Sequence, residues 1–174
     1  MDSQAFSQAF EAYSDELFRH ALLRLSDRER ALELTQECFL RAMEYTRKGE
    51  VIEQVRPFLY RTLRHLIIDE YRRKKAVSLE ALAERAEEEP EALLPADESN
   101  TLEAAIDRLD GAAVLRAAQE LPDLYREALT LRYVEGLSPR EIAAIIGESE
   151  NTVSVRVHRA LKKLRELLEH DEQF

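Results

Sequence analysis

The sequence predicts an all-α protein of two small helical domains joined by an acidic linker, the C-terminal one a helix-turn-helix. Three observations lead to this prediction. First, Ala, Leu, Glu and Arg, which favour helices, dominate the 174 residues, and the chain has only four glycines. Second, apolar residues recur at helical spacing in both halves of the chain. Third, a strongly acidic segment that contains Pro90 and Pro95 separates these halves.

The N-terminal half is predicted to form a small bundle of three helices. The apolar residues at helical spacing in the first helix are Phe6, Phe10, Tyr13, Leu17 and Ala21. Asp27 is expected to cap the second helix, which Lys48 and Gly49 end. Its apolar face carries Ala31, Leu34, Cys38 and Met43. The third helix starts near Pro57, a residue tolerated in a first turn, and runs to about Lys75. On it Leu59, Leu63, Leu66 and Ile67 are expected to turn inward.

Charge is distributed unevenly along the chain, whose formal net charge is −10. Residues 51–75 carry a net charge of +4 and end in the basic run Arg72–Lys75, whereas residues 76–110 carry −9. The composition of the acidic segment is typical of a solvated linker. We therefore expect folded domains at residues 1–75 and 111–174.

The C-terminal domain is predicted to begin with two helices. The first covers Ala112–Glu120 and stops before Pro122, because proline lacks the N–H that a continuing helix needs. The second covers Leu124–Val134, with Asp123 as its N-cap, and ends at Gly136.

A helix-turn-helix is predicted to follow. Ser138 can cap a short helix in which Pro139 takes the first position and Glu141 completes a capping box. That helix ends at Gly147, and Ser149 is expected to cap the last helix. A short helix, a turn with glycine and a longer helix form a pattern that many DNA-binding domains use.

The last predicted helix, from about Glu150 to Leu168, has two different faces. Its apolar face carries Val153, Val157, Ala160, Leu161, Leu164, Leu167 and Leu168. The opposite face carries Asn151, Val155, His158, Arg159 and Lys162, flanked by Thr152, Ser154 and Lys163. Small polar residues near its start can reach base edges in a major groove, and the later basic residues can hold phosphates. An ordinary amphipathic surface helix is the alternative, because basic residues near a C-terminus also suit the helix dipole.

Val155 is unusual on this polar face, because it is expected to point away from the core and to be exposed. A thymine methyl group is one candidate partner for its side chain. Isolated apolar residues are nevertheless common on protein surfaces and need no partner. Whether Val155 reads a base therefore stays open.

Three segments of the chain carry a family resemblance. They are ERALELTQECFLRAMEY and RPFLYRTLRHLIIDEYRRKK in the first half and LPDLYREALTLRYVEGLSPREIAAIIGESENTVSVRVHRALKKL in the second. The first two resemble the signature helices in the N-terminal domain of the extracytoplasmic-function (ECF) sigma factors of bacterial RNA polymerase. The third resembles the promoter-reading C-terminal domain of the same family. Their order, their spacing and the linker match too, so the resemblance covers nearly the whole chain.

The resemblance implies roles for three groups of residues. The group that matches the surface docking on a coiled coil of the largest polymerase subunit is Glu33, Gln36, Glu37 and Arg41. The group that matches the segment recognising and opening the −10 promoter element is Arg61, Arg64, His65, Asp69, Arg72 and Arg73. The group that matches the helix reading the −35 element is Asn151, Thr152, Ser154, Val155, Arg156, His158, Arg159 and Lys162. The family commonly has Asn where this chain has His65, so whether His65 reads a base stays open.

The implied function is that of a sigma factor, which binds core RNA polymerase and directs promoter recognition, DNA opening and transcription initiation. Its partners would be the coiled coil and the flap of core polymerase, promoter DNA as duplex and as melted single strand, and, as a candidate, an anti-sigma factor. The acidic linker would be either a passive tether or a segment lying in the basic polymerase channel. The alternatives are a stand-alone helix-turn-helix regulator with a sensing or dimerising N-terminal half, and an interaction protein that has lost DNA binding.

Other classes of function are disfavoured by the sequence. The single cysteine, Cys38, can form neither an internal disulfide nor a thiolate zinc site, and its place on an apolar face predicts a buried thiol. The four histidines are scattered without metal-ligand spacing, and no glycine-rich phosphate loop is present. No stretch approaches the ~18 apolar residues of a membrane span, and the first residues do not resemble a signal peptide. We expect a cytoplasmic, non-enzymatic protein without metal, cofactor, small-molecule substrate or membrane insertion.

Overall fold

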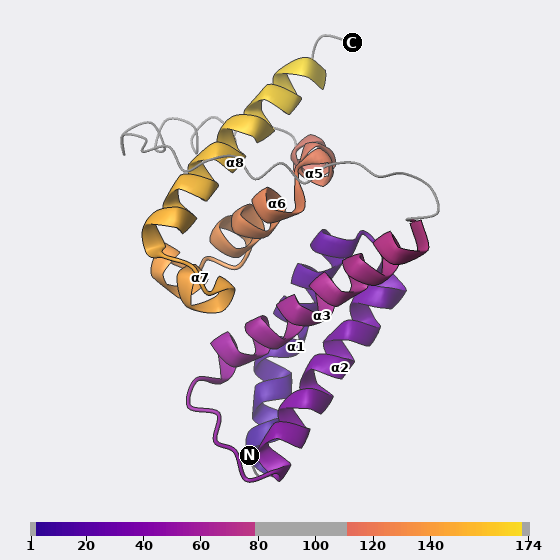
Figure 1. The fold of residues 1–174 in the computed structure, drawn as a ribbon, viewed down its shortest axis with the longest axis vertical. Coiled ribbons are helices and arrows are strands. Elements are labelled where there is room, and N and C mark those ends of the chain that lie inside the picture. Colours follow the sequence, from indigo (N-terminus) through magenta and orange to yellow (C-terminus); the bar gives the residue numbers. More distant parts are fainter. Residues whose placement is uncertain (1–2, 79–110, 172–174) are drawn as a thin grey trace. The chain divides into compact units, whose positions relative to one another are not determined.

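The computed structural model describes residues 3–78 and 111–171, which belong to two compact units. The first unit contains α1 (Ser3–Leu25), α2 (Arg28–Arg47) and α3 (Val55–Ser78) (Figure 1). The second contains α5 (Gly111–Glu120), α6 (Asp123–Leu129), a π-helical turn η1 (Thr130–Val134), α7 (Pro139–Ile146) and α8 (Glu150–Asp171). Every regular element within these ranges is helical, which confirms the predicted all-α class. From residue 79 onward, the predicted linker over residues 76–110 lies outside the described residues.

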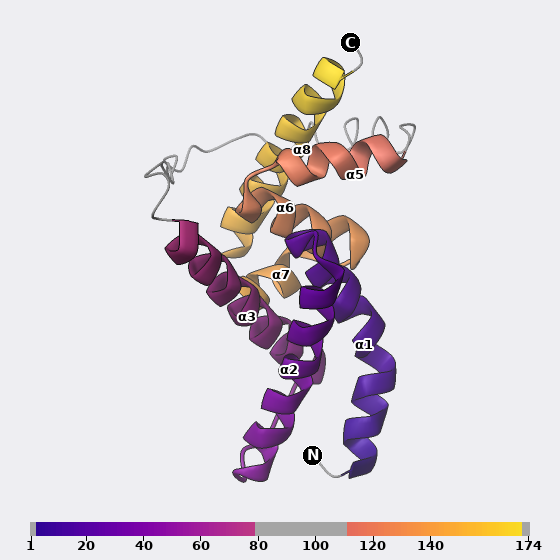
Figure 2. The same cartoon turned by 90° about the vertical axis from the view of Figure 1, so that its right-hand side faces the viewer.

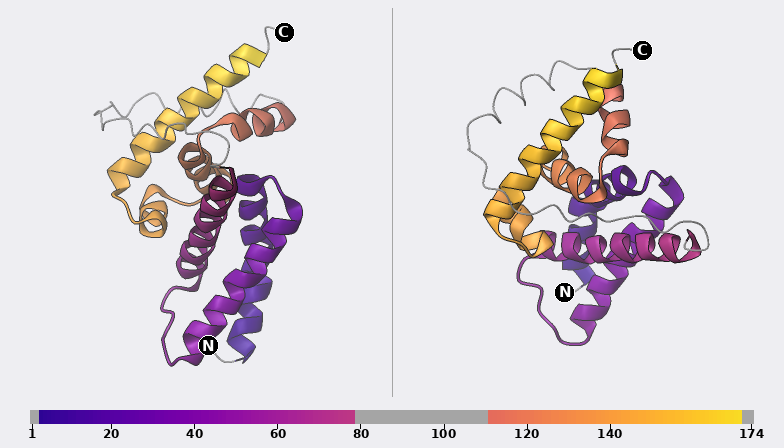
Figure 3. Two further views of the ribbon diagram at one scale, coloured as in Figure 1. Left: turned by 45° about the vertical axis from the view of Figure 1, so that its right-hand side comes forward. Right: turned by 45° about the horizontal axis from the view of Figure 1, so that its top comes forward.

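The three helices of the first unit pack around one apolar core. α2 runs back alongside α1, and α3 packs against both (Figures 2 and 3). The buried residues of this core include Leu17, Ala21, Ala31, Leu34, Cys38, Leu59, Leu63, Leu66 and Ile67. They recur every three or four residues, the spacing that places one side of a helix inside. The inward side predicted for α3 is therefore confirmed.

Local signals set the ends of α2 and α3. The Asp27 carboxylate accepts a hydrogen bond from the N–H of Arg30 at 3.0 Å and so caps α2, as predicted. After the C-cap of α2, Gly49 has a φ of +92°, a left-handed conformation that glycine adopts without strain. Pro57 lies in the first turn of α3, where backbone N–H groups have no intrahelical partner. α3 ends at Ser78, slightly beyond its predicted end.

Two positions in the first unit differ from the prediction. Met43 is 42% exposed instead of lying on the inner face of α2, and Ala42 is buried in its place. The reason is helical geometry: four residues after Cys38 the inner face returns at residue 42, and the next residue is turned by a further ~100°. Phe10 is 45% exposed, although its ring packs against Phe39 with the two centroids 4.9 Å apart.

In the second unit α8 packs against α5, α6 and α7. The buried residues of its core include Leu121, Ala128, Leu131, Ile142, Ile145, Val153, Val157, Ala160, Leu161, Leu164 and Leu168. Arg126 fastens α6 to α5, because its Nε donates to the Ala118 carbonyl at 3.1 Å and its Nη2 to the Leu121 carbonyl at 3.0 Å. These carbonyls lie in the last turn of α5 and just beyond its end, where carbonyls lack intrahelical partners.

The helix predicted over Leu124–Val134 begins earlier and is not a single α-helix. The prediction that Asp123 caps it is wrong, because Pro122 takes the cap position with an extended backbone, ψ 143°, and Asp123 is already in the first turn. An acidic residue there still favours the helix through its dipole. α6 then widens into η1, in which the Glu135 N–H donates to the Thr130 carbonyl at 3.0 Å.

The helix-turn-helix has the predicted caps. The Ser138 hydroxyl accepts from the Glu141 N–H at 3.3 Å, and the Glu141 carboxylate accepts from the Ser138 N–H at 2.8 Å, so the capping box is complete. Gly147 ends α7 with a φ of +77°. The Ser149 hydroxyl then accepts from the Thr152 N–H at 3.0 Å and caps α8. These bonds therefore set where α7 begins and ends and where α8 begins.

Candidate nucleic-acid and protein interfaces

One side of α8 brings the predicted −35-reading residues together. On the inner side Val153, Val157, Ala160, Leu161, Leu164 and Leu168 are buried as predicted, and Leu167 is half-buried. Of the predicted reading residues, Asn151, Ser154 and Lys162 are exposed, and Thr152, Val155, Arg156, His158 and Arg159 are half-buried. A polar start followed by basic residues on the second helix of a helix-turn-helix is an arrangement that fits a major groove.

Some side chains on this side of α8 are partly covered or hydrogen-bonded within the protein. Val155 is half-buried, so the expectation that it is exposed is wrong. The Ser154 hydroxyl donates to the Glu150 carbonyl at 3.0 Å. Nη2 of Arg156 donates to the two carboxylate oxygens of Glu148 at 2.8 and 2.7 Å. Since Glu148 belongs to the turn before α8, this ion pair ties the helix to that turn.

α3 presents basic residues on its solvent side. Of the predicted −10 residues, Arg61, His65, Asp69, Arg72 and Arg73 are exposed, and Arg64 is half-buried. Asp69 and Arg72 form an exposed ion pair with 3.8 Å between Oδ1 and Nη1. Ile68 on the same side is half-buried. Cations beside a partly covered apolar residue suit contacts with the phosphates and unstacked bases of a single strand.

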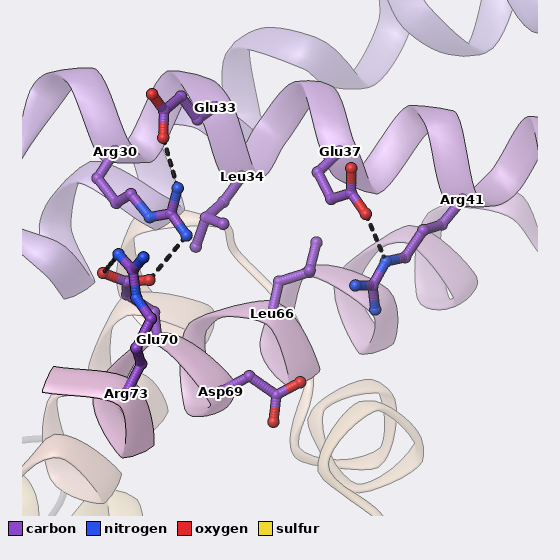
Figure 4. Close-up of a pocket in the computed structure, with 9 residues that line it drawn as sticks. All are labelled: Arg30, Glu33, Leu34, Glu37, Arg41, Leu66, Asp69, Glu70 and Arg73. Atoms are coloured by element: carbon purple, nitrogen blue, oxygen red, sulfur yellow. Dashed lines mark hydrogen bonds and ion pairs between the residues drawn. The ribbon is translucent and has the colours of Figure 1, made fainter. Parts of the chain in front are cut away.

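A shallow groove between α2 and α3 joins the two predicted interfaces of the first unit (Figure 4). Its lining residues are Arg30, Glu33, Leu34, Glu37, Arg41, Leu66, Asp69, Glu70 and Arg73. Three of them, Glu33, Glu37 and Arg41, come from the group predicted to contact polymerase, and Arg41 Nε donates to Glu37 at 2.9 Å. Asp69 and Arg73 come from the −10 group. The sequence does not reveal that the two groups meet.

Sequence reasoning does not single out two residues that line this groove, the half-buried Arg30 and the buried Glu70. Glu70 is 2% exposed. Its Oε1 accepts a hydrogen bond from Arg73 Nη2 at 3.0 Å, and its Oε2 lies 2.8 Å from Arg30 Nη2, while Arg30 Nη1 donates to Glu33. The sequence feature that indicates burial of Glu70 is its position on the inner face of α3, one turn after Ile67.

Opposite charges keep this buried carboxyl ionised. Burial alone would raise the pKa of Glu70, but hydrogen bonds and charges from Arg73 and Arg30 outweigh that effect, and its pKa is lowered. The pKa of Arg30 is raised, first by its hydrogen bond to Glu33 and then by its bond to Glu70. Glu70 is therefore a charged acid between two charged arginines at neutral pH.

Two other buried titratable groups, His20 and Cys38, are kept uncharged at neutral pH. Burial, followed by the positive charges of Arg24 and Arg19, lowers the pKa of His20 to about 3. The Cys38 thiol donates to the Leu59 carbonyl at 3.2 Å, and burial raises its pKa to about 12, so the predicted buried thiol is confirmed. In the part of the chain that the structure describes, no cluster of His, Cys, Asp and Glu could hold a metal ion. No helix in that part is long and apolar enough to cross a membrane.

Both units match known protein families. Residues 9–77 match sigma-70 region 2, and residues 111–164 match sigma-70, region 4. The ECF RNA polymerase sigma factor BldN of Streptomyces coelicolor is 30% identical, over 98% of this chain and 62% of that protein. The ECF sigma factor SigW of Bacillus subtilis is 27% identical, over 96% of this chain and 90% of that protein. The ECF sigma factor SigL of Mycobacterium tuberculosis is 31% identical, over 90% of this chain and 84% of that protein.

The fold also resembles a solved structure, that of the sigma factor RpoE in complex with the anti-sigma factor NepR from Bartonella quintana. The TM-score is 0.71 at 24% sequence identity, and the match covers 95% of this chain and 98% of that chain. A stand-alone regulator with a sensing N-terminal half is not favoured, because the N-terminal unit matches a sigma-70 region of its own.

Proposed function

Because this chain belongs to the ECF sigma factors of RNA polymerase, we propose that it binds core polymerase and directs the recognition and opening of promoters. The observation that carries the proposal is the pairing of sigma-70 region 2 and region 4 in one chain, each on its own folded unit. The protein would catalyse no reaction itself and would act in the cytoplasm, where polymerase transcribes.

α2 supplies the proposed contact with the coiled coil of the largest polymerase subunit. Gln36 is exposed, and the exposed carboxylates of Glu33 and Glu37 are paired with arginines of the same helix. Ion pairs in water contribute little to stability, so these groups can exchange partners for charged groups of polymerase at small cost. The flap would contact the second unit. An anti-sigma factor is a further candidate partner, since the similar solved structure is a complex of RpoE with the anti-sigma factor NepR.

α3 supplies the proposed contacts with the −10 element. The phosphates of a separating strand would meet arginines of this helix, namely Arg61, Arg64, Arg72 and Arg73. Ile68 offers an apolar surface for an unstacked base. His65 is exposed one turn before Asp69, and it can contact either a base or a phosphate.

α8 supplies the proposed contacts with the −35 element. The small polar residues at its start, Asn151, Thr152 and Ser154, would reach base edges, and Asn151 and Ser154 are exposed. His158, Arg159 and Lys162, further along, would hold phosphates.

The net charge of −10 also supports delivery by polymerase. Neutralisation of phosphates by Lys and Arg provides most non-specific affinity for DNA, so an acidic chain binds duplex DNA weakly on its own. A factor that reaches promoters as part of a polymerase complex does not need such affinity.

Run-off transcription with purified core polymerase on a library of promoter fragments tests the proposal. Specific transcripts that require the protein would support it. Gln36→Ala should reduce affinity for core polymerase, whereas Glu166→Gln, in an exposed pair with Lys163 on α8, should leave that affinity unchanged. A protein that never associates with core polymerase but shifts duplex DNA unaided would refute the proposal.

A further inference from the structure

Four charged side chains connect α2 to the DNA-facing side of α3. They form the Glu70 cluster, which consists of Arg30, Glu33, Glu70 and Arg73 (Figure 4). Arg30 and Glu33 lie one turn apart on α2, and Glu70 and Arg73 lie one turn apart on α3. Acids and bases alternate through the cluster, which is therefore neutral as a whole.

Glu70 is the centre of the cluster and its most buried member. Its side chain is 1% exposed, whereas that of Arg73 is 64% exposed. A buried carboxylate is costly unless cations lie close to it. Each oxygen of Glu70 has such a cation, with Arg73 Nη2 at 3.0 Å from Oε1 and Arg30 Nη2 at 2.8 Å from Oε2.

Arg73 is held differently from its neighbour Arg72. The partner of Arg72 is the exposed carboxylate of Asp69 at 3.8 Å, whereas Arg73 is anchored on a buried acid. One nitrogen of the Arg73 guanidinium is engaged there, and most of the side chain stays in contact with water. An arginine fixed at one edge and accessible at the other is preorganised to bind a phosphate.

We propose that Glu70 is a positioning residue for promoter binding, which holds Arg73 toward the DNA backbone and, through Arg30, ties it to the polymerase-contacting helix α2. The inference rests on the proposed function. It assigns Glu70 no contact with DNA, because the carboxylate is buried beneath both arginines.

The test uses holoenzyme assembled from core polymerase and the full chain, on a promoter obtained from the run-off experiment. Glu70→Gln keeps the size of the side chain but removes its charge. We expect open-complex formation to fall about threefold to tenfold, the effect of leaving one long side chain unfixed. Affinity for core polymerase should change by less than about twofold.

The direction of the charge effect and one control variant separate positioning from charge. Removal of a negative charge by itself strengthens attraction to DNA, so a loss of open complex cannot come from the altered net charge. Glu166→Gln removes the same charge from an exposed pair on α8 and should show no loss.

A double-mutant cycle separates positioning from a general loss of stability. In an Arg73→Gln background, Glu70→Gln should cause no further loss, because the side chain that it positions is gone. Arg73→Lys keeps the positive charge but loses the planar guanidinium group. Its open-complex formation should therefore fall to the level of Glu70→Gln. This exposed substitution also carries the test if Glu70→Gln does not fold. Additive losses in the cycle, or wild-type opening by Arg73→Lys, would overturn the inference.

Failure of this inference differs from failure of the proposed function. If the wild-type protein supports no polymerase-dependent initiation, the proposed function is wrong, and the inference with it. If the wild type initiates but Glu70→Gln lowers core affinity and leaves promoter opening intact, Glu70 supports α2 alone and the positioning role is wrong.

Discussion

Acid should destabilise the α1–α3 unit through a single buried histidine. His20 is 2% exposed, its ring lies edge-on to Tyr60, and its pKa falls from 6.5 to about 3 on folding. Between these two pH values the unfolded chain binds a proton at His20 that the folded chain does not. The free energy of unfolding therefore decreases as the pH falls through this window, and the full stability is present above about pH 6.5.

The size of the effect follows from the two pKa values. Each pH unit below 6.5 lowers the free energy of unfolding by about 1.4 kcal/mol until the pKa of the folded state is reached. At pH 4 the loss amounts to roughly 3 kcal/mol, a large share of the ~5–15 kcal/mol that stabilises a typical domain. The lowered pKa of Glu70 acts in the same direction, because its carboxylate loses its stabilising charge in acid. A variant is therefore needed to isolate His20.

Urea unfolding of the full chain, followed by circular dichroism between about pH 7.5 and pH 4, measures this loss. Leucine has a volume similar to that of histidine and no ionisable group. In His20→Leu the free energy of unfolding should therefore change less steeply with pH than in the wild type, by the equivalent of about one proton. His65→Leu, at an exposed position of the same unit, controls for removal of a histidine. Equal slopes in the wild type and His20→Leu, or an NMR titration of the folded His20 ring near pH 6.5, would refute the reasoning.

Three further predictions concern single side chains. Glu148→Gln should weaken holoenzyme binding to −35 duplex in anisotropy measurements about fivefold, as much as Arg156→Gln does, because the pair holds both Arg156 and the turn in place. A loss in Arg156→Gln alone would show that Arg156 acts without this pair. Cys38 should react with a thiol reagent at least about 100-fold more slowly in the native protein than in urea, and equal rates would contradict its burial. Ser26→Gly should raise stability by up to about 1 kcal/mol, because Ser26 has a φ of +52°; a lower melting temperature would count against this.

Helix ends were predictable where the groups that form them are close in sequence. Ser138, Gly147 and Ser149 each act on backbone groups within four residues, so their types and spacing were enough. The start of α6 was missed because two local signals compete there. Pro122 has a fixed φ of −49° and takes the cap position, which leaves Asp123 inside the helix.

Contacts between helices were not predictable in the same way. Periodicity shows which side of a helix turns inward, but it does not show which residue of another helix lies opposite. Glu70 lies on the inner stripe of α3, yet its partner Arg30 is on α2, far away in sequence. For the same reason the sequence separates the polymerase group and the −10 group, whereas the structure places members of both in one groove.

Intramolecular acids accompany the basic residues on both proposed DNA-binding helices. Arg73 is paired with Glu70 on α3, and Arg156 with Glu148 beside α8. Each pair fixes an arginine in place while cancelling its long-range charge. Long-range charge governs non-specific attraction to DNA, whereas fixed geometry governs specific contacts. Such pairing therefore lowers the non-specific attraction without removing the specific contacts. The chain can thus keep positioned arginines within a net charge of −10, and polymerase, rather than bulk electrostatics, would bring them to a promoter.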